Sequence, residues 1–495
     1  MDSIPPTLLQ ALQQPHRYPG DVGQVELVQT HISWVLLAGA FAYKIKKPVA
    51  LPFLDFSTLA LRKKYCDDEL RLNRRFSQEL YLDVVAIFNT VQDPRFEGMG
   101  EPIEYAVKMR RFDQVGRLDR VCARGELRAA HLSGLADTLA TFHTAAKRAP
   151  PASAYGSPDA VMAPMRDNLR DLMAARPPKG VAQQLVALQA WTESEFEKLA
   201  PLLQARQLSG CVRECHGDLH LANLVLIDNQ VQMFDCIEFS DELRWIDVAS
   251  EIAFVYVDLM AHRQPGLAGW FVNEVWERTG DYQAALVLRF YAVYRALVRA
   301  KVAAIGEQAT HHGAPEMLAY IALAERLTLP PPLRLVITHG LSGCGKTTAS
   351  SHLLQTDAYA HTVRVRSDTE RKRLFGREGT SSNGTGTVTG SGIYTPDDNA
   401  ATYRHLFHLC EMLLCAGWSV IVDATFLMRA DRESFRALAR RIGAAFSILA
   451  PKATSEQLRE RIVTRQRQGR DASDATLDVL AHQMKVVEPL APEEA

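Results

Sequence analysis

The chain has almost no net charge, few cysteines and no long apolar run, and each shortage argues against a class of protein. Its 56 lysines and arginines nearly balance 57 aspartates and glutamates, so no overall field draws it to nucleic acid or anionic lipid. Its 8 cysteines are too scattered for a disulfide framework and indicate a reducing compartment. Its longest apolar stretches, near residues 34–43 and 252–261, are shorter than the ~20 residues that a membrane-spanning helix needs.

The first residues also lack the features of a secretory signal. Residues 1–14 contain Asp2 and two prolines instead of a basic region followed by an apolar one. We therefore expect a cytoplasmic protein with no membrane segment. No motif in the sequence reports its oligomeric state.

Length and one proline run divide the chain. At 495 residues it exceeds what one hydrophobic core usually serves. Apolar residues at helical spacing over 316–327 are followed by prolines at 330–332, which cannot continue a helix, and then by an apolar run over 333–337. We therefore expect one domain over 1–328 and a second over 333–495.

The second domain opens with a phosphate-binding motif. An apolar strand run over 333–338 leads into a segment that fits G-x-x-x-x-G-K-[ST] at every fixed position. Its glycines let successive amides point at phosphate oxygens, Lys346 reaches the β- and γ-phosphates, and Thr347 binds Mg²⁺. The nucleotide-binding residues that this motif predicts are Gly340, Leu341, Ser342, Gly343, Cys344, Gly345, Lys346, Thr347 and Thr348.

A second acidic position follows at Asp423, which closes the apolar run 419–423. At the carboxyl end of a parallel strand, this carboxylate would hold the metal or its water, and a role as N-cap of the next helix is compatible with that. The Gly/Ser/Thr-rich tract 376–392 is interpreted as a mobile loop inside the domain.

One helix beyond the phosphate-binding motif, the segment 365–373 resembles small P-loop kinases of the gluconate-kinase and polynucleotide-kinase type. The resemblance implies that Asp368 orients or deprotonates an acceptor hydroxyl and that Arg371 holds its anionic group. It also implies a lid arginine, here Arg465, that neutralises the transferring phosphoryl group. The alternatives stay open: Asp368 as a helix cap, and the arginines as a solvated helix face.

The first domain contains a kinase-type catalytic loop. From His216 to Asn223 the sequence reads H-G-D-L-H-L-A-N, which matches the kinase pattern H-x-D-x-x-x-x-N. Two short strands over 224–227 and 231–234 follow around a turn, and they deliver Asp235.

The roles follow from that order. Asp218 accepts or orients the proton of the substrate hydroxyl, and Asn223 and Asp235 bind the Mg²⁺ that bridges the phosphates of ATP. His216 packs the loop. A zinc site is the weaker alternative because it lacks a distant second ligand pair; its ligands would be Cys211, Cys215, His216 and His220.

A strand pair near the N-terminus supplies the lysine of this site. Strands over 33–38 and 41–46 around Gly39 place Lys44 and Lys46 on one face, because strand side chains alternate. We choose Lys44 as the nucleotide-binding lysine, with Lys46 as the alternative.

Two further positions complete the expected site. Glu69, in the helical stretch 61–76, would form the ion pair with that lysine. The strand run 105–112 would lead into the hinge between two lobes, where Met109 would lie against adenine.

At this point the whole chain resembles the bifunctional aminoglycoside-phosphotransferase/ATP-binding proteins of bacteria. The residues that carry the resemblance are Lys44–Pro48, Phe53–Phe56, Glu69–Arg75, His216–Asn223, Phe234–Phe239, Trp245–Asp247 and the phosphate-binding motif. The resemblance implies a bilobal, α+β, protein-kinase-like domain with a small lobe over 1–112 and a large lobe over 113–328. A three-layer α/β/α P-loop domain with a parallel sheet would follow it.

The expected function is an ATP-dependent phosphotransferase with ATP and Mg²⁺ as cofactors, whose two nucleotide sites each phosphorylate a hydroxyl of a small molecule. Two alternatives stay open. One is a nucleotide-binding regulator or sensor with a single active module. The other makes the C-terminal domain a polynucleotide 5′-hydroxyl kinase, which would bind oligonucleotides with a salt-dependent affinity.

Three departures from related kinases limit this expectation. No G-x-G-x-x-G covers the phosphates of the first site, and Cys236 and Ile237 follow Asp235 where protein kinases have Phe-Gly. The neutral composition argues against a cationic aminoglycoside acceptor. The sequence does not name the acceptor.

Overall fold

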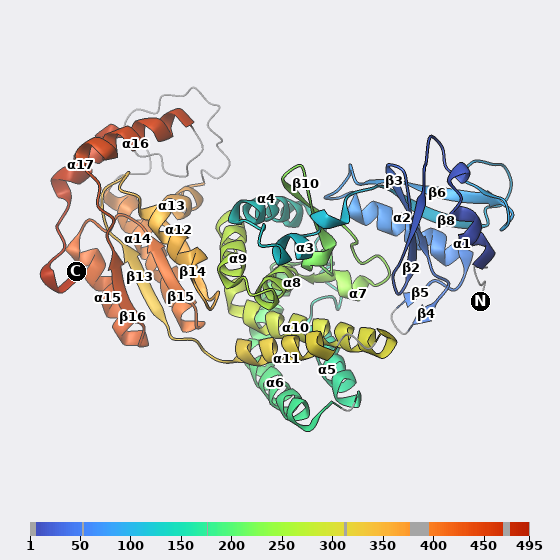
Figure 1. Cartoon of the computed structure of the whole chain (residues 1–495). Coiled ribbons are helices and arrows are strands. Elements are labelled where there is room, and N and C mark those ends of the chain that lie inside the picture. Colours follow the sequence, from blue (N-terminus) through green and yellow to red (C-terminus); the bar gives the residue numbers. More distant parts are fainter. Residues whose placement is uncertain are drawn as a thin grey trace. The chain divides into compact units, whose positions relative to one another are not determined.

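The computed structural model forms two compact units (Figure 1). Unit 1 comprises Met1–Pro177 and Thr192–Asp258, and unit 2 comprises Pro178–Trp191 and Leu259–Ala495. The structure describes residues 6–51, 54–175, 177–310, 314–376, 396–468 and 476–494. Of the tract 376–392, all but Gly376 therefore lies outside the described residues.

The proline run 330–332 lies between α11 (Ala314–Thr328) and β13 (Arg334–Thr338), as the sequence indicates. Residues 259–328 nevertheless belong to unit 2 by their contacts. The domain limits 1–328 and 333–495 remain a prediction.

Unit 1 begins with an antiparallel sheet of strand order β1-β2-β3-β8-β6-β7, on which α2 packs through β6 and β8. The strands pair because each places buried apolar side chains, such as Leu36 and Ile45, toward one core. The expected bounds of the two strands around Gly39 are confirmed. The elements are α1 (Pro6–Leu12), η1 (Pro15–Arg17), β1 (Val25–Gln29), β2 (Ser33–Ala38), β3 (Phe41–Lys46), β4 (Ala50–Leu51), β5 (Leu54–Asp55), α2 (Leu59–Asn73), β6 (Tyr81–Asn89), β7 (Pro94–Arg95) and β8 (Glu104–Arg110).

The rest of unit 1 is mainly helical and carries two short strand pairs. The expected hairpin is present as β10 and β11, and Asp228 and Asn229 form its turn with φ of 49° and 62°, values that Asp and Asn tolerate best after glycine. The elements are η2 (Gln114–Gly116), α3 (Leu118–Ala123), α4 (Ala129–Ala145), α5 (Pro158–Ala174), β9 (Val212–Glu214), η3 (Leu221–Asn223), β10 (Leu224–Ile227), β11 (Gln230–Met233), α7 (Asp241–Arg244) and β12 (Trp245–Asp247). The helices α6 (Lys179–Leu208) and α8 (Val248–Ala261) run across the division between the units.

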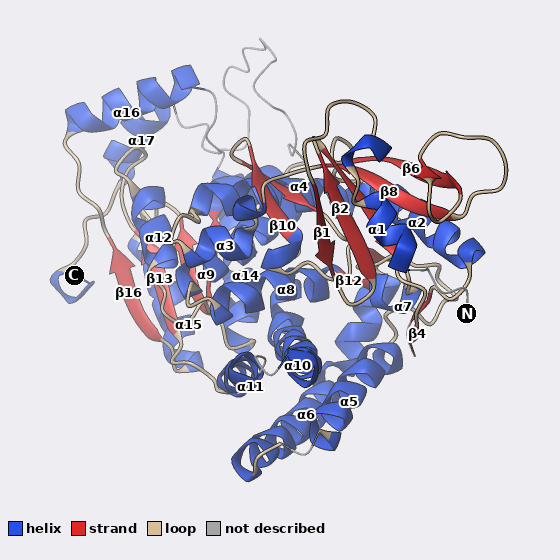
Figure 2. Ribbon diagram, turned by 45° about the vertical axis from the view of Figure 1, so that its right-hand side comes forward, coloured by secondary structure: helices blue, strands red, loops and turns tan. Residues whose placement is uncertain are grey.

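Unit 2 is built around a parallel sheet of order β14-β15-β13-β16. Of its two inner strands, β15 is buried along its whole length. The helices α12, α14 and α15 pack on the sheet, and α14 also contacts α15 (Figure 2). The expected parallel α/β sheet is confirmed. The elements are α9 (Pro265–Thr279), α10 (Ala284–Thr310), α11, β13, α12 (Lys346–Gln355), β14 (Thr362–Arg366), α13 (Ser367–Leu374), α14 (Pro396–Cys415), β15 (Ser419–Asp423), α15 (Arg429–Ile442), β16 (Ala445–Leu449), α16 (Ser455–Gln468), α17 (Leu477–Val486) and η4 (Pro492–Glu494).

Among the described residues, every helix is too short or too polar to cross a bilayer.

Candidate functional site

The catalytic-loop motif forms a tight turn in which two predicted site residues touch. Asp218 follows β9, and Asn223 ends η3. The amide nitrogen of Asn223 donates to the main-chain oxygen of Asp218 at 2.9 Å and to its carboxylate at 3.2 Å. The Asp218 side chain is 36% exposed. A loop carboxylate is thus oriented by its own neighbour while remaining partly open to solvent.

The hairpin then carries Asp235 back to the same place. Past the last strand pair, Leu224 opposite Met233, the Phe234 amide donates to the Asn223 carbonyl at 3.0 Å. Asp235 is the next residue, has a φ of 64°, and its amide donates to the Tyr81 hydroxyl at 2.9 Å. Asn223 and Asp235 therefore lie at the same end of the hairpin.

A buried lysine from β3 reaches this end. Lys44 Nζ lies 2.8 Å from Glu69 Oε1 and also forms an ion pair with Asp235. Lys46 Nζ lies 2.7 Å from the other oxygen of Glu69 and pairs with Glu238 instead. Both candidate lysines thus share Glu69, but they differ in their second partner, which is Asp235 for Lys44 and Glu238 for Lys46.

Burial and charge set the protonation of this network. Burial alone would raise the pKa of Glu69, but the adjacent ammonium groups of Lys44 and Lys46 outweigh it and lower the pKa to about 2. Burial alone would lower the pKa of Lys44, but Asp235 and then Glu69 outweigh it and raise the pKa above its ordinary value. The lysine and Glu69 are therefore both charged at neutral pH.

Beneath the catalytic loop, Glu251 of α8 holds the main chain in place. Its carboxylate accepts hydrogen bonds from the amides of His216 and Gly217 and pairs with His143 of α4. Burial would raise the pKa of Glu251, but the His143 hydrogen bond and charge and the His216 contacts lower it to about 2. Sequence reasoning missed this carboxylate because no local pattern marks it.

The same region contains the residues that the sequence offered as a zinc site. Within the described residues, the group with metal-ligand spacing is His143, Cys215 and Glu251, not the set predicted from sequence. Burial raises the pKa of the Cys215 thiol well above its ordinary range, so this sulfur is protonated in the structure as it stands. His216 is fully buried and its Nε2 bonds the Phe234 carbonyl at 2.8 Å. The contacts of His216 are therefore those of a packed residue.

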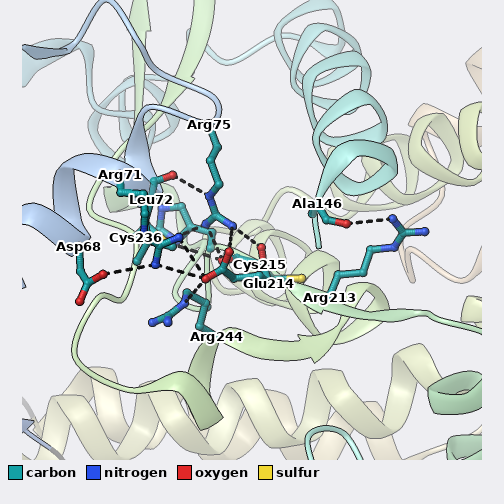
Figure 3. A network of polar contacts seen from close by, with 12 residues as sticks. Asp68, Arg71, Leu72, Arg75, Ala146, Arg213, Glu214, Cys215, Cys236 and Arg244 are labelled. Carbon is teal, nitrogen blue, oxygen red and sulfur yellow. Dashed lines mark hydrogen bonds and ion pairs between the residues drawn. The ribbon is translucent and has the colours of Figure 1, made fainter. Parts of the chain in front are cut away.

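Arginines at the end of α2 fix the strand that leads into the loop (Figure 3). Arg71 and Arg75 lie 3.4 and 3.3 Å from the buried Glu214 carboxylate, and Arg244 lies 3.3 Å from it. Arg75 also donates to the Cys215 carbonyl at 3.0 Å. Helix α2 therefore supplies Glu69 to the lysine, and the end of α2 and the turn after it supply two arginines to the Glu214 carboxylate of β9.

Met109 lies near the end of β8, opposite Ala42 and Tyr81. Its side chain is buried in an apolar cluster of this sheet. The expected contact of Met109 with adenine remains a prediction.

In unit 2 the phosphate-binding motif has the expected strand, loop and helix. It runs from β13 to α12, which begins at Lys346. Gly343 has a φ of 85°, and a β-carbon there would come within 3.0 Å of the Leu458 carbonyl, so glycine is required. Lys346 Nζ folds over the loop and donates to the carbonyls of Gly340 and Leu341, each at 2.9 Å.

The helices α16 and α17 contact this loop. Arg461 donates to the Gly343 carbonyl at 3.2 Å, and the Ser342 amide donates to the Gln483 side-chain oxygen at 2.8 Å. Leu341 and Cys344 pack against the apolar cluster Leu458, Ile462 and Leu480, whereas Thr347 and Thr348 are exposed. Arg461 and Gln483 are additional contacts that sequence reasoning did not select.

The predicted lid arginine cannot be placed in the same way. Arg465 belongs to α16, and its side chain lies outside the described part of the structure. This helix begins with a capping box, in which the Thr454 amide donates to the Gln457 side chain at 3.0 Å and the Gln457 amide to the Thr454 hydroxyl at 3.3 Å.

Asp423 lies beside the start of α12. Ser350 donates to the Asp423 carboxylate at 3.1 Å and to the Thr347 carbonyl at 3.1 Å. Because β15 is the neighbour of β13, the carboxyl end of β15 brings Asp423 next to the loop. Arg366, opposite Asp423 in β14, has its Nε 4.0 Å from that carboxylate.

The two predicted acceptor residues lie on α13. Asp368 is in its first turn and half-buried, and Arg371 is one turn later and 5% exposed. A solvated helix face therefore does not describe Arg371. The roles of Asp368 and Arg371 in binding an acceptor remain predictions.

Comparison with known proteins places both modules. The family described as "Phosphotransferase enzyme family" matches residues 56–282, and the family described as "AAA domain" matches residues 335–490. Uncharacterized proteins of Mycobacterium tuberculosis and Mycobacterium bovis are 30% identical over 463 residues, 92% of this chain and 89% of theirs.

Solved structures of kinases match the chain only at low identity. A choline/ethanolamine kinase family protein from Mesorhizobium loti is 11% identical with a TM-score of 0.39, covering 64% of this chain and 99% of that one. The amicoumacin kinase hAmiN, in complex with AMP-PNP, Ca²⁺ and Ami, is 13% identical with a TM-score of 0.40, covering 64% and 92%. The chain belongs, with its mycobacterial relatives, to the bifunctional proteins that join an aminoglycoside-phosphotransferase-like domain to a P-loop kinase-like domain.

Proposed function

We propose that the protein is an ATP-dependent phosphotransferase with two nucleotide sites, in domains over 1–328 and 333–495, each phosphorylating a hydroxyl group of a small molecule. The observation that carries the proposal is the meeting of Lys44 with Glu69 and Asp235 at the end of the hairpin that begins at Asn223. A charged lysine held by two carboxylates at such a place is arranged to bind phosphate oxygens.

In the first site, Lys44 would bind the phosphates of ATP, with Glu69 holding the ammonium in place. Asp218 would accept the proton of the acceptor hydroxyl while that oxygen bonds to the γ-phosphorus. The bond from the γ-phosphorus to the bridging oxygen breaks, so ADP and a phosphorylated acceptor leave.

The residues of this site suit a hard divalent cation such as Mg²⁺. The side-chain amide nitrogen of Asn223 donates a hydrogen bond to Asp218, so the side-chain oxygen of Asn223 is left to bind the metal. The Asp235 carboxylate is 44% exposed and supplies further oxygens. Bound Mg²⁺ would neutralise phosphate charge.

In the second site, the loop amides from Gly340 to Thr348 and Lys346 would cradle the phosphates of a second ATP. Thr347 and Asp423 would provide the oxygen ligands of its Mg²⁺. By the resemblance to small P-loop kinases, the acceptor would be bound by Asp368 and Arg371, with Arg465 in the lid.

The test follows products rather than ATP consumption alone. The wild type, Asp218→Ala and Lys346→Ala are each incubated with γ-labelled ATP and a metabolite library. We expect each variant to lose one set of labelled products and to keep the other. If the Asp218 variant keeps every product, the first module is a nucleotide sensor; if both variants do, the proposal is wrong.

A further inference from the structure

Helix α9 lies against the outer strand of the parallel sheet in unit 2. In this sheet β14 pairs with β15, and its other edge faces α9. The Asn273 amide closes that edge: its nitrogen donates to the Thr362 carbonyl at 2.8 Å, and its oxygen accepts from the Arg364 amide at 2.6 Å. One buried side chain thus replaces the missing neighbouring strand.

One turn later, Glu277 gathers the end of β14 and the start of α13. Its carboxylate accepts from Arg366 at 2.8 Å and from the Thr369 hydroxyl at 3.2 Å, and pairs with Arg364 at 3.2 Å. The Glu277 carbonyl accepts from Arg373 at 2.8 Å. Burial would raise the pKa of Glu277, but Arg366 and then Arg364 outweigh it and lower the pKa, so the carboxylate is charged.

The backbones are packed too closely for α9 to shift easily. A β-carbon at Gly266 would come within 1.7 Å of the Gln355 carbonyl oxygen at the end of α12. A β-carbon at Gly269 would meet Ala360, just before β14. Helix α9 is therefore packed closely against the segment that joins α12 to β14.

Arg366 connects helix α9 to the second site. It ends β14 opposite Asp423, and ligands of open parallel sheets bind at the carboxyl ends of the strands. Asp368 follows it by two residues in the first turn of α13. A shift of Arg366 or Thr369 would therefore move both Asp423 and Asp368.

We propose that Glu277 is a positioning residue of the second site: through Arg366 and Thr369 it fixes the catalytic end of β14 and α13, although it precedes the proline run and lies within the stretch matched by the phosphotransferase family. The P-loop module is then completed by a helix that the sequence assigns to the other module. The inference rests on the proposed transferase activity of the second site.

The experiment uses the full chain with Asp218→Ala, so that the remaining turnover of γ-labelled ATP, with a pooled metabolite extract as acceptor source, reports the second site. Into this background are placed Glu277→Gln, Arg366→Gln, both together, and Lys346→Ala. Glu274→Gln is the matched control, since it lies on the same helix, and its side chain is 10% exposed against 12% for Glu277. Glu274 pairs with Arg278 at 3.1 Å and lies 3.9 Å from Arg364.

We expect Glu277→Gln to lower kcat by about tenfold or more, as loss of a buried charged hydrogen bond does, while KM for ATP changes less than about threefold. Glu274→Gln stays near the background rate. The double variant is no slower than Arg366→Gln alone, because both changes break one connection.

Other outcomes separate the two proposals. If Lys346→Ala abolishes turnover but Glu277→Gln matches Glu274→Gln, the role of Glu277 is overturned and the transferase stands. Two further outcomes would mean that Glu277 only stabilises the fold. One is an additive loss of activity in the double variant. The other is an equal loss in both glutamate variants, together with lowered melting temperatures. If Lys346→Ala leaves turnover at the background, both proposals fail.

Discussion

The two candidate sites are assembled in opposite ways. In the first, Lys44, Glu69 and Asp235 come from separate elements and meet through ion pairs, and Asp218 is held by hydrogen bonds from Asn223. In the second, nine consecutive residues form the loop and the first turn of α12, and the lysine that opens this helix donates to carbonyls of the loop. The first site therefore depends on long-range packing and charge, whereas the second depends on local backbone conformation. This difference predicts how each site fails.

The largest effect is expected from the catalytic carboxylate. In a Lys346→Ala background, Asp218→Asn removes the proton acceptor but keeps the shape of the side chain, so the remaining turnover should fall by about 10²–10⁴-fold. Initial rates with labelled ATP measure it. Asp228→Asn in the hairpin turn is the control, because asparagine tolerates its positive φ equally well. Equal rates for the two variants would show that Asp218 takes no part.

Removal of one positively charged side chain, that of Lys346, should inactivate the second site. In an Asp218→Ala background, Lys346→Ala is expected to reduce turnover by roughly 10²-fold, the size of the loss when a charge-stabilising donor is removed. The melting temperature should hardly change, because the lysine bonds only to its own loop in the described structure. The exposed Lys452→Ala is the control. A large fall in melting temperature would make Lys346 a structural residue and weaken the contrast between the sites.

Low pH should destabilise the first site through Glu251, which holds the main chain of its loop. Its folded pKa of about 2 lies below its ordinary value of 4.5, so its charge stabilises the fold above pH ~4.5, and this stability is lost as the pH falls toward 2. Glu251→Gln keeps the shape and should lower the free energy of unfolding by about 3 kcal/mol at pH 7, with the difference vanishing near pH 2. Chemical unfolding at several pH values measures it. The exposed Glu126→Gln should differ little from the wild type, and a pH-independent effect of Glu251→Gln would contradict the account.

The smallest effect concerns the contact between α17 and the loop. The Gln483 side-chain oxygen accepts the hydrogen bond of the Ser342 amide, which a phosphate oxygen would need. Gln483→Ala removes this competitor, so the affinity for Mg-ATP should rise a few-fold, about 1 kcal/mol. Binding of a fluorescent ATP analogue in a Lys44→Ala background measures it, with the exposed Gln466→Ala as control. Weaker binding would instead make Gln483 part of the nucleotide site.

The sequence predicted the local features of the two sites but not the contacts between distant residues. The strand bounds around Gly39, the hairpin before Asp235 and the phosphate-binding loop are local patterns, and the structure has them as expected. Strand alternation put Lys44 and Lys46 on one face but could not choose between them, because the choice depends on Asp235, almost two hundred residues away.

Long-range partners were out of reach for the same reason. Among the adjacent acids of α2, Glu69 is buried, while Asp67 pairs with Lys63 on the surface, a distinction set by helix rotation against the sheet. Glu251 and Glu277 are ordinary helix glutamates in the sequence. Their roles appear only when the loop or strand that each one holds is folded against it.

Calorimetric titration with a non-hydrolysable ATP analogue and Mg²⁺ tests the central claim most directly. The account predicts two bound nucleotides per wild-type chain, one in Lys44→Ala, one in Lys346→Ala, and none when both lysines are replaced. A single nucleotide per wild-type chain, or a stoichiometry that neither lysine changes, would contradict it.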